Sequence, residues 1–145
     1  MSYVLDQQQA SGHDQDLRAA LQAAELPIDD LEQTGRVFFR FADQGRVVGF
    51  GGMEPYGDCA LLRSVVVLPD QRGRGYGEAI SRRLLDEAGR AGARTVYLLT
   101  QSAAAFFEHL GFVKVERASA PAEILQTRQA ASLCPESAGL FAKSI

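Results

Sequence analysis

Residues 72 to 77 are the segment whose composition and spacing could most directly do chemistry. They read Arg-Gly-Arg-Gly-Tyr-Gly, with glycine at every second position. Glycine lets the backbone approach a ligand closely, and a helix that begins here would add unpaired N–H groups and the positive end of its dipole. The two arginines would add charge-assisted hydrogen bonds. The segment therefore predicts a site for a phosphate-containing ligand; the alternative is a tight turn with two solvated arginines.

Two common phosphate-binding loops do not fit this segment. A Walker loop ends in Gly-Lys-Ser or Gly-Lys-Thr, which is absent here. The dinucleotide-binding fingerprint needs a glycine where Glu78 stands, and an acidic residue at the end of the next strand, which the stretch 94–99 lacks. Both nucleoside triphosphate hydrolysis and dinucleotide binding are therefore disfavoured.

A buried strand and an amphipathic helix must hold the glycine segment in place. The run 61–68, LLRSVVVL, is rich in β-branched and aliphatic residues, and Pro69 ends it. Apolar residues recur after the glycines at the spacing of one helix face, namely Ile80, Leu84, Ala88 and Ala91. A strand, a glycine-rich turn and a helix N-terminus together bring backbone N–H groups to one point.

The remaining segments predict a mixed α/β order in one domain over residues 1–145. A first strand is expected within residues 1–10, carried by Tyr3, Val4 and Leu5. Further strands are expected at 37–43, 47–54, 61–68, 95–99, 112–116 and 139–143. Helices are expected at 17–24 with Asp14 as N-cap, briefly from Asp29, from the glycine segment onward, and at 102–110 and 121–127. Tight turns between the strands at 37–68 predict an antiparallel meander. A βαβ unit and then a terminal pair of strands are expected to follow it.

Composition and charge narrow the class of function. The apolar fraction of 46% is ordinary for a soluble protein, and the net charge of −3 argues against nucleic acid as a partner. No apolar run approaches the roughly 20 residues of a membrane span, and no signal peptide is recognisable. Cys59 and Cys134 do not make a disulfide framework, so a cytoplasmic location is expected. No metal site is predicted, and Cys134 is expected to be a buried structural residue.

The pattern Arg72-x-x-Gly75-x-Gly77 resembles the acyl-CoA signature R/Q-x-x-G-x-G/A of the GNAT superfamily of N-acyltransferases. The order of elements from Leu17 onward is similar to the GNAT fold. The resemblance implies a central, twisted, mostly antiparallel sheet with flanking helices, in which the strands at about 61–68 and 95–99 splay apart. It also implies acetyl-CoA as the co-substrate, with its diphosphate on the glycine segment and its pantetheine arm in the gap between those strands.

The same resemblance implies a set of coenzyme A contacts. The free backbone of Val65 and Val67 would pair with the pantetheine amides, and the N–H of Val66 or Val67 would stabilise the oxyanion. Phe106 would pack in the core or against pantetheine. The residues expected to bind the co-substrate are Val65, Val66, Val67, Arg72, Gly73, Arg74, Gly75, Tyr76, Gly77, Ser102 and Phe106.

Two closer resemblances bear on the acceptor. The stretches LLRSVVV (61–67), YLLT (97–100) and SLCPESA (132–138) look like the small acetyltransferases found in arsenic-resistance operons. The pattern LLT…FF…GF within 98–112 resembles the acetyltransferase domain of N-acetylglutamate synthases. Both imply acetyl transfer to the amine of a small amino acid or an amino-acid-like toxic compound, such as an organoarsenical or phosphinic analogue, by direct attack in a ternary complex.

The catalytic groups of the family pattern are partly missing. A carboxylate is common where Leu61 stands, and the nearest substitute is Glu54, a candidate general base whose alternative role is an exposed strand-end carboxylate. A tyrosine that protonates the leaving thiolate is common where Phe106 and Phe107 stand. The hydroxyl of Thr100 or Ser102 could replace it, or a thiolate of pKa ~8–9 could leave unaided.

Two arginines are candidates for binding the acceptor. Arg63 interrupts an apolar strand and could clamp a substrate carboxylate; an outward-facing, solvated arginine is the equal alternative. Arg40, between Phe39 and Phe41, is the second candidate for the same task.

Because catalytic groups are missing, a non-catalytic acyl-CoA-binding regulatory module is the alternative to an enzyme. The expected partner of an enzyme is a small-molecule amine, and that of a binding module is a protein. Homodimerisation through the C-terminal strands stays open.

Overall fold

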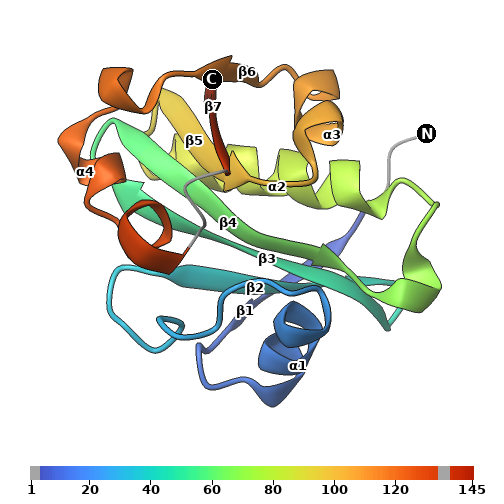
Figure 1. Ribbon diagram of the computed structural model, residues 1–145. Helices are drawn as coiled ribbons and strands as arrows, with labels where there is room; N and C mark the ends of the chain where they lie inside the picture. Colours follow the sequence, from blue (N-terminus) through green and yellow to red (C-terminus); the bar gives the residue numbers. More distant parts are fainter. Residues whose placement is uncertain (1–3, 134–137) are drawn as a thin grey trace.

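The strands of the computed structural model, which describes residues 4–133 and 138–145, form a seven-stranded sheet in the order β1-β2-β3-β4-β5-β7-β6 (Figure 1). They are β1 (Asp6–Ala10), β2 (Val37–Asp43), β3 (Arg46–Tyr56), β4 (Cys59–Val67), β5 (Thr95–Thr100), β6 (Val113–Val115) and β7 (Gly139–Ser144). β4 and β5 are parallel, and every other neighbouring pair is antiparallel. The expected meander, βαβ unit and terminal strand pair are confirmed.

Helices lie on both faces of this sheet. They are α1 (Gln15–Ala23), α2 (Tyr76–Arg90), α3 (Ala104–His109) and α4 (Ala122–Leu125), with short helical turns η1 (Pro69–Gln71), η2 (Arg117–Ser119) and η3 (Gln129–Leu133). Asp14 caps α1 as predicted, since its carboxylate accepts a hydrogen bond of 3.0 Å from the N–H of Leu17. α2, which follows the glycine segment, packs against β3 and β4.

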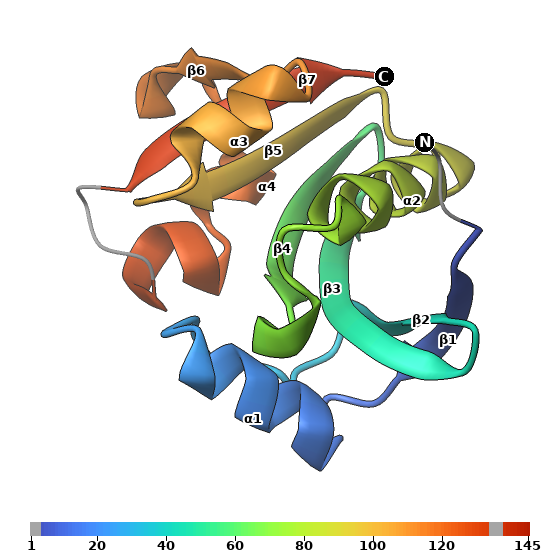
Figure 2. The same ribbon diagram turned by 90° about the vertical axis from the view of Figure 1, so that its right-hand side faces the viewer.

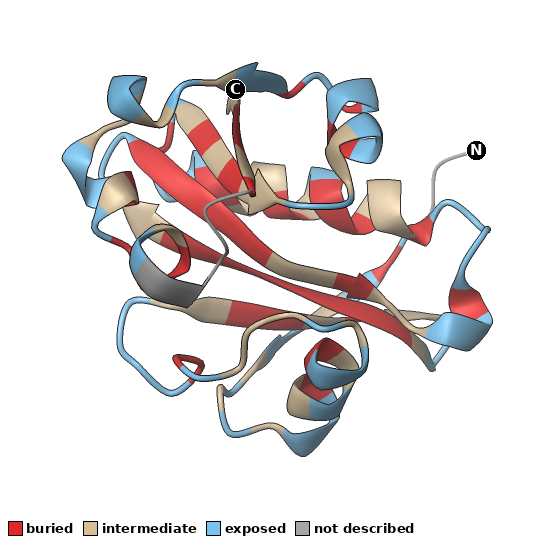
Figure 3. Cartoon of the chain, in the orientation of Figure 1, coloured by how far each residue is buried: buried red, intermediate tan, exposed pale blue. Residues whose placement is uncertain are grey.

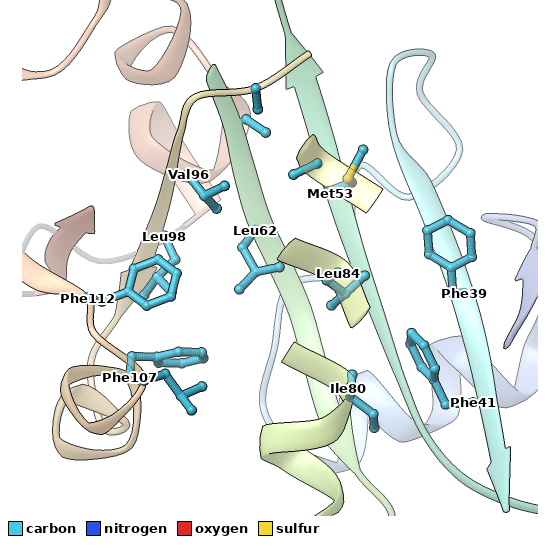
Figure 4. Close-up of a cluster of buried hydrophobic side chains, with 14 of the residues drawn as sticks. Phe39, Phe41, Met53, Leu62, Ile80, Leu84, Val96, Leu98, Phe107 and Phe112 are labelled. Atoms are coloured by element: carbon cyan, nitrogen blue, oxygen red, sulfur yellow. The ribbon is translucent and has the colours of Figure 1, made fainter. Parts of the chain in front are cut away.

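Apolar side chains are packed on both faces of the sheet, whose central strands are largely buried (Figure 3). On the α2 side, Ile80 and Leu84 meet Phe41, Leu62 and other apolar side chains of the sheet (Figure 4). On the α1 side, the buried side chains are Leu17, Leu21, Leu31, Phe38, Phe50 and Val66. A third group consists of Cys59, Leu61, Ile124 and Leu140. Residues of β4 therefore contribute to all three groups, which fixes this strand and its register.

β4 and β5 pair only at their first residues and then diverge. Cys59–Leu61 lie opposite Thr95–Tyr97. Beyond this point β4 carries a bulge, because Arg63 faces Gly52 and Val66 faces Phe50, and Ser64 in the bulge has a φ of +59°. A bulge bends its strand, and the two strands separate toward the carboxyl end of β4 (Figure 2). The predicted splay is confirmed.

Three local predictions were wrong in whole or in part. A first strand lies within residues 1–10 as expected, but it is the polar stretch Asp6–Ala10 and does not include Val4 or Leu5; Tyr3 lies outside the described residues. The backbone of this strand pairs with β2, and the Gln7 side chain bonds Arg83 and Glu87 of α2. No helix forms at Asp29, since the neighbouring Asp30 is drawn into buried ion pairs. Ala91 is exposed because α2 ends at Arg90.

Candidate functional site

The glycine segment forms the N-terminus of α2 and opens onto a cavity. Gly73 and Gly75 have φ values of +78° and +86°, which glycine adopts without strain. Gly75 is the N-cap and provides no side-chain cap, so helix geometry leaves the first N–H groups of α2 without helical partners. The cavity measures about 570 Å³ and is lined by Val67, Gln71, Arg72, Gly73, Arg74, Gly75, Tyr76, Gly77, Glu78 and Phe106. This arrangement suits an anion.

Gly77 leaves space for a neighbouring side chain, whereas the two glycines before it supply a positive φ. Its φ is ordinary, but a Cβ at this position would lie 3.2 Å from the end of the Phe106 ring. Phe106 is 37% exposed and stacks edge-on against Phe107 at 5.0 Å between ring centroids. The ring thus forms one wall of the cavity, as expected for a residue that packs against a bound ligand.

The side chain of Tyr76 has a structural role within the glycine segment. Its ring is buried in the core on the α2 side, and its hydroxyl donates a hydrogen bond of 2.6 Å to Oδ2 of Asp43. Tyr76 can contact a ligand through its backbone N–H, while its side chain ties the start of α2 to the end of β2. The hydrogen bond therefore holds the start of α2 against the sheet.

A second cavity of about 270 Å³ lies in the gap between β4 and β5. Its lining residues are Ala24, Leu26, Pro27, Leu62, Arg63, Ser64, Val65, Val66, Val67, Arg72, Leu98, Leu99, Thr100, Ser102, Ala103, Phe107 and Gln129. We call it the cleft. Val67 and Arg72 line both the cleft and the cavity at α2. The two therefore adjoin, so a ligand with an anionic end and an extended arm could occupy both.

The backbone of β4 faces the cleft at Val67. The N–H of Leu68 donates to the carbonyl of Val48 in β3 at 2.9 Å. Because successive N–H groups of a strand point to opposite sides, the N–H of Val67 points into the gap and that of Val66 toward β3. Of the two predicted oxyanion donors, the geometry thus favours Val67. The Val67 carbonyl accepts a hydrogen bond of 3.1 Å from Nε of Arg72.

A buried cluster of charged side chains lies on the α1 side of the sheet. Nη1 and Nη2 of Arg63 donate to the two carboxylate oxygens of Asp30 at 2.6 and 2.7 Å, and Nη1 also donates to Oε2 of Glu54 at 2.8 Å. Arg36 pairs with Asp30 at 3.0 Å, and the hydroxyl of Tyr56 donates to Oε1 of Glu54. The side chains of Arg63, Asp30 and Glu54 have no exposed surface. The cluster joins the segment between α1 and β2 to β3 and β4.

The pKa values of Asp30 and Arg63 are shifted in the directions that favour their charged forms. Burial alone would raise the pKa of Asp30, but the hydrogen bonds and charge of Arg63, and then of Arg36, outweigh burial and hold it below its ordinary value. Burial would lower the pKa of Arg63, and its two carboxylate partners raise it. The pKa of Tyr56 is raised by burial and by the adjacent Glu54 carboxylate.

These contacts change the interpretation of the two arginines. Arg63 lines the cleft but faces inward, so the expectation of a solvated, outward-facing side chain is wrong. A role as carboxylate clamp would require its guanidinium to leave an existing ion pair. Arg40 pairs with Asp14 at 2.5 Å and lies over the ring of Phe50. The residues that line the cleft do not include Arg40.

The predicted catalytic residues occupy different surroundings. Glu54 is buried, which overturns its alternative as an exposed strand-end carboxylate, and its oxygens are bonded to Arg63 and Tyr56. Thr100 and Ser102 both line the cleft. Oγ1 of Thr100 accepts a hydrogen bond of 3.0 Å from the N–H of Ala103, which leaves its own proton to donate.

Sequence reasoning missed Asp30, Arg36, Tyr56 and Ser64. The first three belong to the buried cluster, and Ser64 lies in the bulge that faces the cleft. An arginine within an apolar strand was the available signal for the cluster, because a buried guanidinium needs carboxylate partners. Nothing in the local sequence indicates a positive φ at Ser64.

Within residues 4–133 and 138–145, no group of three or more His, Cys, Asp or Glu side chains could hold a metal ion. In the same part of the chain, no helix has the length and apolar character needed to cross a membrane. Cys59 is buried with a free thiol, whose pKa is raised by that burial. Cys134 lies outside the described residues.

Comparison with known proteins gives relatives of two kinds. An amino-acid acetyltransferase of Mycobacterium tuberculosis is 36% identical over 81 residues, which are 55% of this chain and 46% of the relative. The [ribosomal protein bS18]-alanine N-acetyltransferase of Escherichia coli is 31% identical over 78 residues, 51% of this chain and 53% of the relative. This chain therefore matches about half the length of each relative.

Solved structures resemble the fold over nearly the whole chain. The N-acetylglutamate synthase of Neisseria gonorrhoeae, complexed with coenzyme A and N-acetyl-glutamate, has a TM-score of 0.81 at 15% identity. The similarity covers 99% of this chain and 36% of that protein. The family model described as an acetyltransferase (GNAT) domain matches residues 34–114, more than half of the sequence. This chain belongs to the GNAT acetyltransferase family.

Proposed function

We propose that this protein transfers the acetyl group of acetyl-CoA to the α-amino group of an amino acid, an amino-acid-like compound or the first residue of a peptide. The observation that carries the proposal is the anion site at the start of α2, which adjoins the cleft between the diverging strands β4 and β5. The first suits a diphosphate, and the second suits an extended chain that carries amides.

The co-substrate is proposed from this geometry together with the comparisons. The N-acetylglutamate synthase that shares the fold was solved with coenzyme A. In this chain, the diphosphate would meet the N–H groups of Gly75 to Gly77, and pantetheine would pair with the gap-facing backbone of Val67. The guanidinium of Arg72, which bonds the Val67 carbonyl, would then move toward the diphosphate and free that carbonyl for a pantetheine amide.

Acetyl transfer from a thioester to an amine requires a neutral amine, stabilisation of the oxyanion and departure of the thiolate. The N–H of Val67 would stabilise the oxyanion. Thr100 lines the cleft, and its hydroxyl would donate a hydrogen bond that stabilises the leaving thiolate. Glu54 is the proposed base; because it is enclosed, any proton that it takes from the amine must be relayed, and the hydroxyl of Tyr56 contacts it.

The acceptor is proposed from the two kinds of relative. One acts, by its name, on amino acids and the other on the alanine of a ribosomal protein. In both acceptors the carbon that carries the α-amino group is bonded to a carbonyl or carboxylate carbon. Organoarsenical and phosphinic amino-acid analogues share this arrangement or a close variant, and they belong among the acceptors to be tested.

The test is release of free thiol from acetyl-CoA against a panel of amines. The panel comprises L-glutamate, L-aspartate, L-methionine, phosphinic and arsinic analogues, and an alanine-initiated tripeptide. We expect amine-dependent release with at least one of them. Gly75→Ala should weaken coenzyme A binding, whereas Gly45→Ala is the matched control, since Gly45 has a φ of +81° in the β2–β3 turn with nothing within 4 Å of its added Cβ.

The second candidate is a non-catalytic acyl-CoA-binding module. It is favoured by the absence of a carboxylate at Leu61 and of a tyrosine at Phe106 and Phe107. Coenzyme A binding with slow thiol release that no amine accelerates would support this module and refute the proposed enzyme.

A further inference from the structure

Ser64 has a backbone conformation that its residue type does not favour. Its φ is +59°, in the left-handed region, where a side chain other than glycine is strained. Glycine would take this position in the β4 bulge without strain. A residue kept in a strained conformation at a ligand-binding cleft points to a role for its side chain. Ser64 lines the cleft.

The Ser64 hydroxyl is held by the neighbouring arginine. Its Oγ accepts a hydrogen bond of 3.1 Å from Nε of Arg63. The other guanidinium nitrogens of Arg63 are bonded to Asp30 and Glu54, so the arginine itself is fixed. Oγ of Ser64 therefore has a set position on the sheet face that carries the buried cluster.

The hydroxyl retains a proton to donate. A serine hydroxyl has one donor hydrogen and accepts through its lone pairs. Across the described residues, the Ser64 side chain accepts the bond from Arg63 and donates none within the protein. Because Ser64 lines the cleft and its hydroxyl hydrogen has no acceptor among the described residues, that hydrogen can be donated to a molecule bound there.

The place of Ser64 along the cleft indicates which molecule that is. The Val67 end adjoins the anion site, so the co-substrate would enter there. Ser64 lies three residues earlier on β4, toward the point where β4 and β5 join at Leu61 and Tyr97. The reactive end of an arm that extends from the anion site would come to rest near this inner end. Ser64 is thus beside the place where acceptor and thioester meet.

We propose that the Ser64 hydroxyl donates a hydrogen bond to an oxygen of the acyl carbon that is bonded to the amine-bearing carbon of the acceptor. This contact would select α-amino acyl compounds over simple amines. This inference rests on the proposed function. The oxygen belongs either to the carboxylate of a free amino acid or to the first carbonyl of a peptide. Arg63 is then a positioning residue, which fixes Ser64 and does not contact the acceptor.

Ser64→Gly is the direct test, because glycine accepts the positive φ and removes only the hydroxymethyl group. Gln44→Gly is the matched control, since Gln44 also has a positive φ, +52°, but lies in the exposed β2–β3 turn. Steady-state kinetics compare each amino acid with the amine that lacks its α-carboxylate, namely L-glutamate with 4-aminobutyrate and L-alanine with ethylamine. An alanine-initiated tripeptide is compared with L-alanine and with ethylamine. Calorimetry measures binding of the same amines to each variant saturated with coenzyme A.

We expect Ser64→Gly to raise the KM or Kd of the α-amino acyl acceptors about ten-fold or more and to leave the KM of acetyl-CoA within two-fold. 4-Aminobutyrate and ethylamine should not distinguish Ser64→Gly from the wild type. If the KM or Kd rises more for the free amino acid than for the tripeptide, the group bound by Ser64 is a carboxylate. If it rises more for the tripeptide, the bound group is a peptide carbonyl.

Two outcomes separate this inference from the proposed function. If the wild type turns over an α-amino acid or peptide and Ser64→Gly keeps its KM within two-fold, the role of Ser64 is refuted while the enzyme stands. If no amine is acetylated but α-amino acids bind the wild type and bind Ser64→Gly ten-fold more weakly, the enzyme is refuted while the Ser64 contact stands. No binding of any amine to the wild type, together with no turnover, refutes both.

Discussion

Replacing Arg63 by alanine is expected to lower the free energy of unfolding by about 3 kcal/mol. Removal of one partner from a buried ion pair costs roughly 3–5 kcal/mol, because the remaining charge is left buried without compensation. Arg63 donates three hydrogen bonds to Asp30 and Glu54 and lies 5.5 Å from the centre of the Phe38 ring. Arg36 still pairs with Asp30 after the change, which places the loss at the lower end of that range.

The assay is urea unfolding followed by far-UV circular dichroism, with the melting temperature as a second readout. A loss of about 3 kcal/mol corresponds to a decrease of roughly 10 °C for a chain of this size. Arg63→Met keeps much of the apolar stem and separates lost packing from lost charge. Arg40→Ala is the control, because the Arg40–Asp14 pair is partly exposed and should contribute less than about 1 kcal/mol. Equal losses for Arg63→Ala and Arg40→Ala would refute the reasoning.

Three further predictions follow from other contacts. Gly77→Ala should weaken coenzyme A binding measured by calorimetry and Phe106→Ala should restore part of it, since the added Cβ meets the Phe106 ring at 3.2 Å; additive effects would contradict this. Tyr76→Phe should lower the free energy of unfolding by about 1–2 kcal/mol, because it leaves Asp43 without its hydroxyl donor; Asp43→Asn, which can still accept, should cost less in the same urea assay. The lowered pKa of Asp30 adds stability that is complete above the unfolded-state value of about 3.9 and is lost as the pH falls through the folded-state value. The difference in unfolding free energy between wild type and Asp30→Asn should therefore be constant above about pH 5 and narrow below about pH 4; a constant difference down to pH 2 would contradict it.

Local patterns were sufficient to predict most of the fold and the glycine-rich start of α2, which lines a cavity. The alternation and β-branched content of the strands, the glycines before α2 and the apolar face of that helix are local properties, and the structure confirms the elements they predict. The first strand was expected a few residues too early, because Gln7 of Asp6–Ala10 finds its partners Arg83 and Glu87 on α2, 76 and 80 residues away in sequence. A polar stretch gives no local sign of such distant partners.

The candidate acceptor side was harder to predict for the same reason. The partners of Arg63 lie 33 and 9 residues away, on the segment before β2 and on β3, and only the folded sheet brings them together. An arginine in an apolar strand could be recognised as unusual, but its orientation depended on a carboxylate at Asp30 that was expected to lie in a short helix. The φ of Ser64 likewise depends on the register of β4 against β3.

The most direct test of the central claim is mass spectrometry of an amine mixture incubated with the protein and acetyl-CoA that carries a deuterated acetyl group. The mixture contains free α-amino acids, an alanine-initiated tripeptide and the corresponding simple amines. An acetyltransferase that uses the cleft between β4 and β5 is predicted to place the label on the α-amino group of at least one amino acid or on the tripeptide. Coenzyme A bound at the start of α2 with no labelled amine in the mixture would contradict the claim.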